Sequence, residues 1–195
     1  MPPLEELHLM TWLHTFSGRE VSILDPKPEQ FALEDIAHAL SMQCRYNGHS
    51  RYFYSIAEHS LLVARALREQ GCGIEVQRVG LMHDATEAYV GDLVAPIKML
   101  PGFAVFKTLE DILWKEGIQP AFELEDIGAE VKRADLRALA TEAPQVMTWP
   151  PPRDWELPSE ATPWPDVWLD FLEPAEAELL FLRECIELGI RAVSR

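Results

Sequence analysis

The chain has 195 residues and a formal net charge of −15, because 17 Lys and Arg stand against 32 Asp and Glu. Such an acidic chain lacks the basic face that binding to a nucleic-acid polymer requires, and anionic lipid surfaces repel it. Hydrophobic residues make up 48% of the chain and charged residues 25%, which excludes a disordered protein and predicts one globular domain over residues 1–195. A small phosphorylated substrate stays compatible with this charge, since a bound metal ion and a few arginines can reverse it locally.

The three cysteines, Cys44, Cys72 and Cys185, are an odd number at long spacings and form no CxxC motif. This pattern predicts reduced thiols in a cytoplasmic protein and disfavours a disulfide framework or a zinc–thiolate site. The first ten residues are acidic, with no basic stretch followed by an apolar one, so we expect no signal peptide. No stretch approaches 18 apolar residues, so we expect no membrane span.

The first half of the chain is predicted to pass from loops into helices. Residues 1–30 are rich in Pro and Gly, and the stretch TFSGREVSIL predicts one or two short strands. A helical pattern begins at Leu33 and is followed by a polar, aromatic loop. The next helix is predicted to begin at Ser55, which forms a capping box with Glu58, and to run to about Gln70.

The second half of the chain is predicted to contain further helices and one irregular segment. The segment from Pro144 to Pro165 holds seven of the fifteen prolines and three of the six tryptophans, so it cannot form a regular helix. We expect it to cross the helical body in an extended form, with Pro144 ending the helix before it. The whole pattern predicts an all-α fold with this Pro/Trp-rich crossing near the C-terminus. The further predicted helices span about 75–90, 103–116, 123–142 and 173–193.

Four tryptophans in or near the crossing admit two interpretations. Their indole rings could stack a nucleobase, or they could pack the crossing against the helices, and packing is the expected role. The four are Trp149, Trp155, Trp164 and Trp168.

Ionisable residues stand where the predicted helices should be apolar. His59 shares a face with aliphatic residues, and His83, Asp84 and Glu87 follow one another within a single turn of the next helix. On a later helix, Asp135 lies on an apolar stripe, where a carboxylate is costly unless it is paired, hydrogen-bonded or metal-bound. Each could also be a satisfied core residue, or Asp135 an ion-pair partner of nearby basic side chains.

Two imidazoles and two carboxylates on different predicted helices form a mixed nitrogen and oxygen ligand set. Such a set suits one divalent ion, Mn²⁺, Co²⁺, Fe²⁺, Mg²⁺ or Zn²⁺, with positions left open for water. The predicted ligands are His59, His83, Asp84 and Asp135. Spacing alone leaves Asp111 and Asp126 as alternatives for the last ligand, and Asp135 is preferred for its apolar stripe.

The segments AEHSLLVARAL and LMHDATEAYVGDLVAPIK resemble the HD-domain superfamily of metal-dependent phosphohydrolases, and within it the 5′-deoxynucleotidase group. The resemblance covers about residues 33–142 and implies an HD-type helical bundle. In that group the HD pair is followed by a Glu three residues later and by a G-D-L-x-x-P-x-K run, as it is here from Gly91 to Lys98. His59, His83, Asp84 and Asp135 match the metal ligands of the superfamily.

The resemblance also implies roles around the metal. Glu87 matches the acid that acts on the attacking water, with Asp84 orienting the nucleophile as well as binding the metal. Asp92 matches a residue that contacts the sugar 3′-hydroxyl. Arg45 matches an Arg that contacts phosphate, and Tyr46 stands where the group has a Trp that helps to exclude a 2′-hydroxyl.

Two residues of the loop before the first metal ligand have no counterpart in the motif. Arg51 could bind phosphate with both guanidinium branches, and His49 could donate a proton to the leaving alkoxide. The alternative is a solvated loop whose His49 is simply hydrogen-bonded.

We therefore expect a metal-dependent phosphohydrolase that acts on a small nucleotide, foremost a deoxynucleoside 5′-monophosphate. One alternative is hydrolysis of an alarmone or nucleoside polyphosphate, although those HD enzymes usually carry a Glu-Asp pair where this chain has Glu87-Ala88. A second alternative is a non-catalytic HD domain that senses a nucleotide or metal. The leucines and isoleucines of the final helix suit either the core or the seam of a homodimer, and a homo-oligomer is expected.

Overall fold

A computed structural model describes residues 11–192 of the chain. The predicted absence of a signal peptide concerns residues 1–10, and the end of the last predicted helix concerns residue 193, so both lie outside the described residues. The first described elements are β1 (Trp12–His14) and β2 (Glu20–Ser22), an antiparallel hairpin in which Leu13 pairs with Val21. Of the one or two short strands predicted over residues 15–24, β2 is confirmed, while β1 lies just before that stretch.

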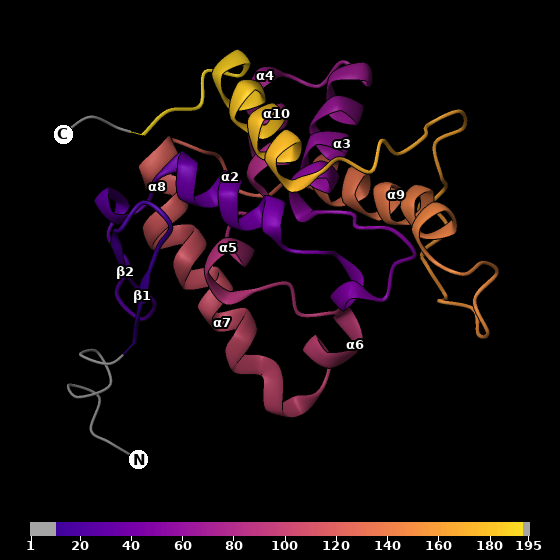
Figure 1. The fold of residues 1–195 in the computed structure, drawn as a ribbon, viewed down its shortest axis with the longest axis horizontal. Helices are drawn as coiled ribbons and strands as arrows, with labels where there is room; N and C mark the ends of the chain where they lie inside the picture. The colour runs from indigo at the N-terminus through magenta and orange to yellow at the C-terminus, as the bar shows by residue number, and fades with distance from the viewer. Residues whose placement is uncertain (1–10, 193–195) are drawn as a thin grey trace.

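Helices form the body of the protein, and the all-α prediction is confirmed (Figure 1). The central helix is α3 (Ile56–Glu69), which packs against α2 (Leu33–Met42), α4 (Ile74–Met82), α9 (Ala129–Val146) and α10 (Pro174–Glu187). Each contributes an apolar face to one continuous core. Among the described residues, no helix is long and apolar enough to cross a membrane.

The start of α3 realises only half of the predicted capping box. The Ser55 hydroxyl accepts a hydrogen bond from the Glu58 backbone N–H at 3.1 Å, as expected for an N-cap. The Glu58 carboxylate instead accepts bonds from backbone N–H groups of the distant segment Asp170–Leu172, at 2.9–3.1 Å. The side chain therefore connects α3 to the crossing rather than closing the helix end.

The single helix predicted over 75–90 is wrong, because the chain breaks at the HD pair. Helix α4 ends at Met82, residues 83–86 form turns, and α5 (Glu87–Val90) follows. The His83 Nδ1 atom lies 2.8 Å from the Gly80 carbonyl oxygen and takes the acceptor that the backbone N–H of Asp84 would use in a continuing helix. Helix α4 thus ends with the His83 side chain bonded back to its last turn, while the His83 backbone keeps helical angles, φ −60° and ψ −31°.

The helix predicted over 103–116 continues further than expected. After α6 (Ala95–Lys98), α7 (Ala104–Ile112) passes through a π-helical stretch, Leu113–Ile118, into α8 (Gln119–Phe122). Gly117 allows the Phe31 ring to pack there, since a Cβ atom at this position would lie 2.3 Å from the ring. The predicted 123–142 helix is displaced to α9, which begins at Ala129.

The prediction that Pro144 ends its helix is also wrong, since α9 runs two residues further, to Val146. Proline removes one helix hydrogen bond, but it leaves the carbonyl oxygens of the last turn free to accept others. Arg51 supplies donors to them: its backbone N–H donates to the Val146 oxygen at 2.6 Å, and its guanidinium donates to the Gln145 oxygen at 3.1 Å.

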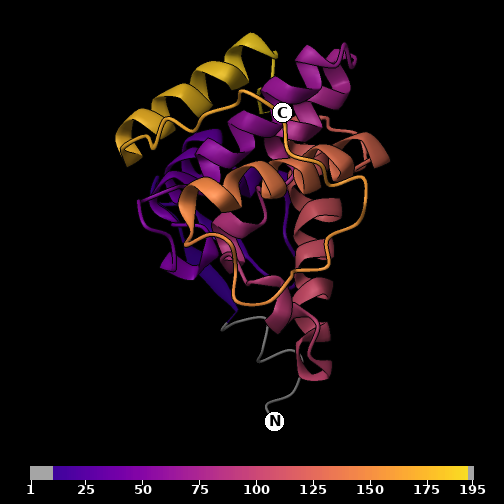
Figure 2. The same ribbon diagram turned by 90° about the vertical axis from the view of Figure 1, so that its right-hand side faces the viewer.

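An irregular segment of residues 147–173, here called the crossing, leads from α9 to α10, and the part predicted over 144–165 belongs to it except for the end of α9. Figures 1 and 2 show it leaving the end of α9, looping outward and returning over the helical body. Packing of tryptophan on the helices is confirmed for Trp164, whose ring lies under the Arg137 guanidinium at 5.0 Å. It is wrong for Trp149 and Trp168, which are 45% and 78% exposed.

Besides Glu58 of α3, two side chains of α9 hold the crossing in place, and the crossing forms no regular secondary structure in the described residues. Gln145 accepts from the Leu169 N–H and donates to the Val167 oxygen, and Thr141 accepts from the Trp164 N–H. The last predicted helix, 173–193, is shorter in the structure. It ends at Glu187, and Gly189 adopts a positive φ of 69° while the Ile190 N–H bonds back to the Cys185 oxygen at 2.8 Å.

Candidate metal centre

Four side chains from three parts of the fold meet beside α3. Two histidine nitrogens, His59 Nε2 and His83 Nε2, lie 3.3 Å apart. The Asp84 carboxylate lies 3.5 Å from the first and 3.3 Å from the second. Asp135 Oδ1, from α9, lies 3.2 Å from His59 Nε2 and 4.0 Å from His83 Nε2. The predicted quartet therefore converges on one point.

The two histidines are both oriented by their other ring nitrogen. His59 Nδ1 lies 2.7 Å from the Glu142 carboxylate, and His83 Nδ1 lies 2.8 Å from the Gly80 carbonyl. An acceptor on Nδ1 favours the tautomer whose proton is there, which leaves Nε2 with a free lone pair. In metal sites the ligating histidines are typically held in this way.

The donor set therefore fits a metal ion. Ligand atoms of His59, His83 and Asp84 lie within 4.8 Å of one another, so this group could hold one. Asp135 adds a carboxylate oxygen on the same side. The alternatives Asp111 and Asp126 are elsewhere: the first pairs with Lys107 at 3.5 Å, and the second accepts from Gln119 at 3.3 Å, both at exposed positions.

Sequence reasoning missed Glu142, the residue that organises the centre from behind. Its buried carboxylate accepts bonds from Tyr54 at 2.9 Å and Tyr46 at 3.1 Å, besides holding His59, and lies 3.4 Å from Arg45 Nε. The available signal was its spacing: Glu142 follows Asp135 by seven residues, which places both on one face of a helix.

The charges of this group are strongly coupled. Burial and the Arg45 charge would lower the pKa of His59, but Glu142 and Asp135 outweigh them and raise it to about 10. Burial would raise the pKa of Glu142, but His59 and Arg45 lower it to about 2. The pKa of Asp135 is lowered as well: its burial opposes the shift, and hydrogen bonding and charge from His59 carry it. Without a metal, the cluster therefore retains a proton that an ion would displace.

Glu87 lies one turn beyond the HD pair as a buried acid. One carboxylate oxygen lies 3.5 Å from the Lys98 ammonium, and the other is buried with no hydrogen-bond partner in the described structure. Burial raises the pKa of Glu87 well above its ordinary value, and the nearby charges of Asp84 and Asp92 raise it further. Lys98 also pairs with Glu110 at 2.9 Å and was not predicted as part of the site.

Arg45 lies beside the cluster. Its side chain is nearly buried, and its NH1 atom lies 3.7 Å from an Asp84 oxygen.

Asp92 lies in the loop after α5. Its backbone N–H donates to the Gln43 side chain at 3.3 Å, and the Gln43 amide also donates to the Glu87 carbonyl at 3.0 Å. Gln43 therefore connects this loop to the start of α5.

The structure does not bring Arg51 and His49 into the cluster. The Arg51 guanidinium donates to the Pro144 and Gln145 carbonyl oxygens at the end of α9. His49 is exposed, and its backbone N–H donates to the Tyr46 oxygen at 3.0 Å. Their predicted substrate contacts stay predictions.

Two bacterial proteins are similar to this chain over most of its length. The uncharacterized protein YfdR of Escherichia coli is 36% identical over 136 residues, which cover 68% of this chain and 71% of YfdR. An uncharacterized protein of Rhodobacter capsulatus is 37% identical over 144 residues, which cover 69% of this chain and 72% of that protein. No protein-family model matches the chain.

Proposed function

For a chain that belongs to the family of YfdR and its Rhodobacter capsulatus relative, we propose the function of a metal-dependent phosphohydrolase. The proposed substrate is a small nucleotide, foremost a deoxynucleoside 5′-monophosphate, which is cleaved by water to a deoxynucleoside and inorganic phosphate. The names of the relatives state no activity, so the proposal rests on the residues of the candidate centre and on their resemblance to the HD superfamily.

One observation carries the proposal: two histidines with fixed Nδ1 atoms present their Nε2 atoms to two carboxylates beside a buried, partly unpartnered acid. A purely structural ion-pair cluster would not need a second acid with a free oxygen. His59, His83, Asp84 and Asp135 would hold the divalent ion. When bound, such an ion lowers the pKa of water and polarises a phosphoryl oxygen.

Glu87 is the proposed general acid–base residue. Its free oxygen is available to hydrogen-bond the attacking water, while Lys98 holds the other oxygen. A carboxyl with a raised pKa is a stronger base, so Glu87 suits accepting the proton of the water. The oxygen of the water then bonds to phosphorus as the bond from phosphorus to the 5′-oxygen breaks, and Glu87 can return the proton to that oxygen.

Arg45 is proposed to stabilise the negative charge of the transferring phosphoryl group. This guanidinium is nearly buried and lies beside Asp84, so water screens it little. A local cation of this kind explains how a chain with a net charge of −15 could bind a phosphate monoester. Asp92, close enough to raise the pKa of Glu87, would contact the sugar hydroxyl.

The wider setting is also proposed to be a cytoplasmic homodimer. All three cysteines are free thiols in the structure, which suits a reducing compartment. On α10, the side chains of Leu179 and Ile186 are 66% and 77% exposed, two turns apart on one face, which suits a helix seam between subunits. Sedimentation analysis of the protein and of a Leu179→Glu variant would test the dimer.

The test of the activity is phosphate release by chelator-stripped protein supplied with Mn²⁺, Co²⁺, Fe²⁺, Mg²⁺ or Zn²⁺ in turn. The substrates are deoxy- and ribonucleoside mono- and triphosphates, together with a guanosine tetraphosphate. We expect metal-dependent release from the deoxynucleoside monophosphates and background rates for Asp84→Ala. Asp111→Ala and Asp126→Ala are the matched controls and should keep wild-type rates, because both residues lie outside the cluster.

Two other outcomes would redirect the assignment. Release from the tetraphosphate or triphosphates alone would favour the nucleoside-polyphosphate alternative. Binding of one metal ion per chain with no phosphate release from any substrate would contradict the phosphohydrolase proposal. It would favour the alternative of a non-catalytic domain that senses a nucleotide or metal.

A further inference from the structure

The crossing brings a second aromatic ring against a residue of the candidate centre. The Trp155 ring lies 6.5 Å from the Tyr46 ring, centroid to centroid, and Trp149 lies 6.0 Å from Trp155 in an edge-to-face arrangement. Tyr46 also lies under the Arg45 guanidinium at 5.5 Å and bonds to Glu142. A row of aromatic rings therefore begins at the metal cluster and extends outward.

The backbone at Tyr46 is held in a conformation that bulky residues rarely adopt. Tyr46 and Asn47 both have positive φ, 57° and 55°. A left-handed conformation is unfavourable for an L-residue with a large side chain, and such conformations gather at functional sites. Here the conformation directs the Tyr46 hydroxyl to Glu142 and leaves its ring facing Trp155.

The exposure of Trp149 separates it from a tryptophan used only for packing. Trp114 is 6% exposed in the core, and Trp164 is partly buried under a guanidinium. Trp149 keeps 45% of its surface open although it contacts Trp155, and Trp155 is itself only partly buried. Apolar ring surface thus remains open beside a site built for a phosphate.

We propose that Trp155 and Trp149, carried by the crossing onto Tyr46, form the wall against which the nucleobase of the substrate stacks. This inference rests on the proposed function. It assigns a role to residues 147–155, which lie outside the part of the chain that resembles the HD phosphohydrolases.

The chemistry of a nucleotide matches this order of groups. Its phosphate is charged and belongs at Arg45 and the ligand quartet, while its base is flat, neutral and at the other end of the molecule. Stacking is available to every base, because each has a π-face, so the wall predicts preference for nucleotides over other phosphate monoesters with little choice among bases. In a chain this acidic, uncharged ring surface attracts a base without repelling the phosphate.

The test compares nucleotides with a substrate that lacks the base. The probes are the four deoxynucleoside 5′-monophosphates and 2-deoxyribose 5-phosphate, hydrolysed by the metal-loaded protein. We expect Trp155→Leu to raise the KM for the nucleotides about tenfold, the size of one lost base–aromatic stack, and Trp149→Leu to raise it less. Neither should change hydrolysis of 2-deoxyribose 5-phosphate, and Trp155→Phe should restore most of the nucleotide KM.

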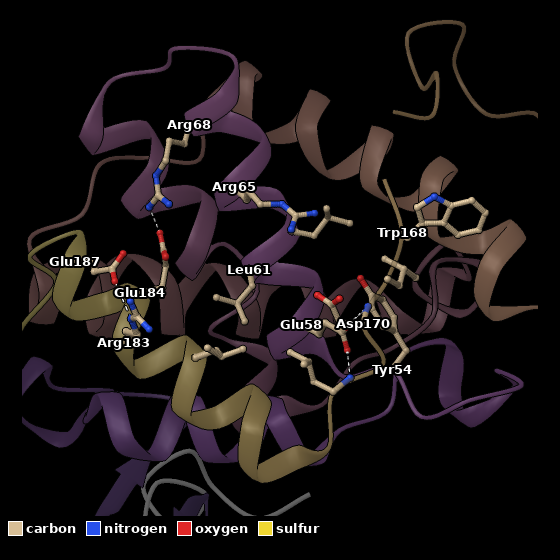
Figure 3. A pocket seen from close by; sticks show the side chains of 14 residues that line it. Tyr54, Glu58, Leu61, Arg65, Arg68, Trp168, Asp170, Arg183, Glu184 and Glu187 are labelled. Atoms are coloured by element: carbon tan, nitrogen blue, oxygen red, sulfur yellow. Dashed lines mark hydrogen bonds and ion pairs between the residues drawn. The ribbon is translucent and has the colours of Figure 1, made fainter. Parts of the chain in front are cut away.

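Trp168→Leu is the matched control, since this indole is 78% exposed and lies at the cavity lined by Glu58 and Arg65 (Figure 3). It should leave both substrates unaffected. Loss of activity on both substrates in Trp155→Leu, or on neither, would overturn the wall, and the first result would assign Trp155 a structural role.

Binding separates this inference from the proposed reaction. If the wild-type protein hydrolyses none of the probes, the phosphohydrolase fails, and calorimetric titration still tests the wall. Deoxyadenosine monophosphate should then bind more tightly than 2-deoxyribose 5-phosphate to the wild type but not to Trp155→Leu. Equal affinities for the wild type would overturn the wall.

Discussion

The helices α3 and α9 each carry two sets of buried or half-buried polar side chains that make different kinds of contact. On the inner side, His59 contacts both Asp135 and Glu142, and these acids are near other charged side chains. On the outer side, Glu58 and Gln145 bond to the backbone of the crossing. Figure 3 shows this outer side, where Glu58 reaches the crossing beside a cavity of about 270 Å³.

The difference between the two sides is clearest in two glutamates. Glu58 accepts bonds from neutral N–H donors, and no cation offsets its burial. Burial therefore raises the pKa of Glu58, the Asp170 charge adds to the rise, and the hydrogen bonds lower it in part. Burial acts on Glu142 in the same direction, but the charges of His59 and Arg45 overcome it and lower the pKa to about 2. Buried Glu58 thus holds the backbone of the crossing, whereas buried Glu142 stabilises the positive charges of His59 and Arg45.

The largest effect is expected from Glu142→Gln, which removes the charge and keeps the shape. Arg45 and His59 then lose their buried counter-charge, and breaking such a pair costs on the order of 3 kcal/mol. We expect metal affinity to fall about 10–100-fold, since the group that orients a ligating histidine is weakened. Calorimetric metal titration and thermal unfolding of the stripped protein measure both effects, and unchanged affinity would remove Glu142 from the centre.

The second prediction concerns pH. The pKa of His59 is raised to about 10 in the folded, metal-free protein, whereas an ordinary value is 6.5. Between these values the folded state binds more protons than the unfolded state, so stability is complete below pH 6.5 and is lost as pH rises toward 10. One proton limits the slope to about 1.4 kcal/mol per pH unit.

Thermal unfolding of the stripped protein from pH 6.5 to 10 measures this slope. Saturation with metal should remove it, because the ion replaces the proton on His59, and Glu142→Gln should reduce it. A stripped protein whose stability is constant over this range would contradict the coupling.

On the outer side, Glu58→Gln is expected to cost stability and nothing else. The amide oxygen can still accept two N–H bonds, but the amide nitrogen faces the Leu172 N–H and leaves a buried donor unsatisfied. This costs about 1–3 kcal/mol. Metal affinity should stay within twofold of wild type, so a large loss of affinity would show that the two sides of α3 are not separate.

The smallest effect is expected from Gln145→Ala, which removes two bonds to the crossing, at about 1 kcal/mol. The Leu169 amide should exchange hydrogen faster, while the Leu172 amide, held by Glu58, should keep its rate. Equal acceleration at both amides would mean that the crossing opens as one unit.

Much of the fold could be predicted from local patterns. The start of α2 at Leu33 and the span of α3 follow from apolar spacing and from the Ser55 cap, and both are confirmed. The break after Met82 could not be predicted, because helical periodicity continues through it and no Gly or Pro stands at residues 82–86. The end of α9 was predicted too early, at Pro144, because the donors that bond to its last carbonyl oxygens come from Arg51, far away in the sequence.

The candidate site divides in the same way. Polar residues on apolar stripes, together with the HD resemblance, led to His59, His83, Asp84 and Asp135, which the fold brings together. Glu142 escaped notice because a buried acid is informative only when its partners are known. Its partners, at positions 45, 46, 54 and 59, precede it by more than 80 residues.

Glu58 and His59 are adjacent in the sequence, but the partners of Glu58 are synthesised later than those of His59. The residues that bond to Glu58 follow it by up to 114 positions, which corresponds to roughly ten seconds at about 5–20 residues per second on the ribosome. Asp135 and Glu142, the last residues on the inner side, emerge before Asp170 does. The growing chain therefore holds every named residue of the inner side of α3 before the backbone donors that Glu58 binds on the outer side have been made.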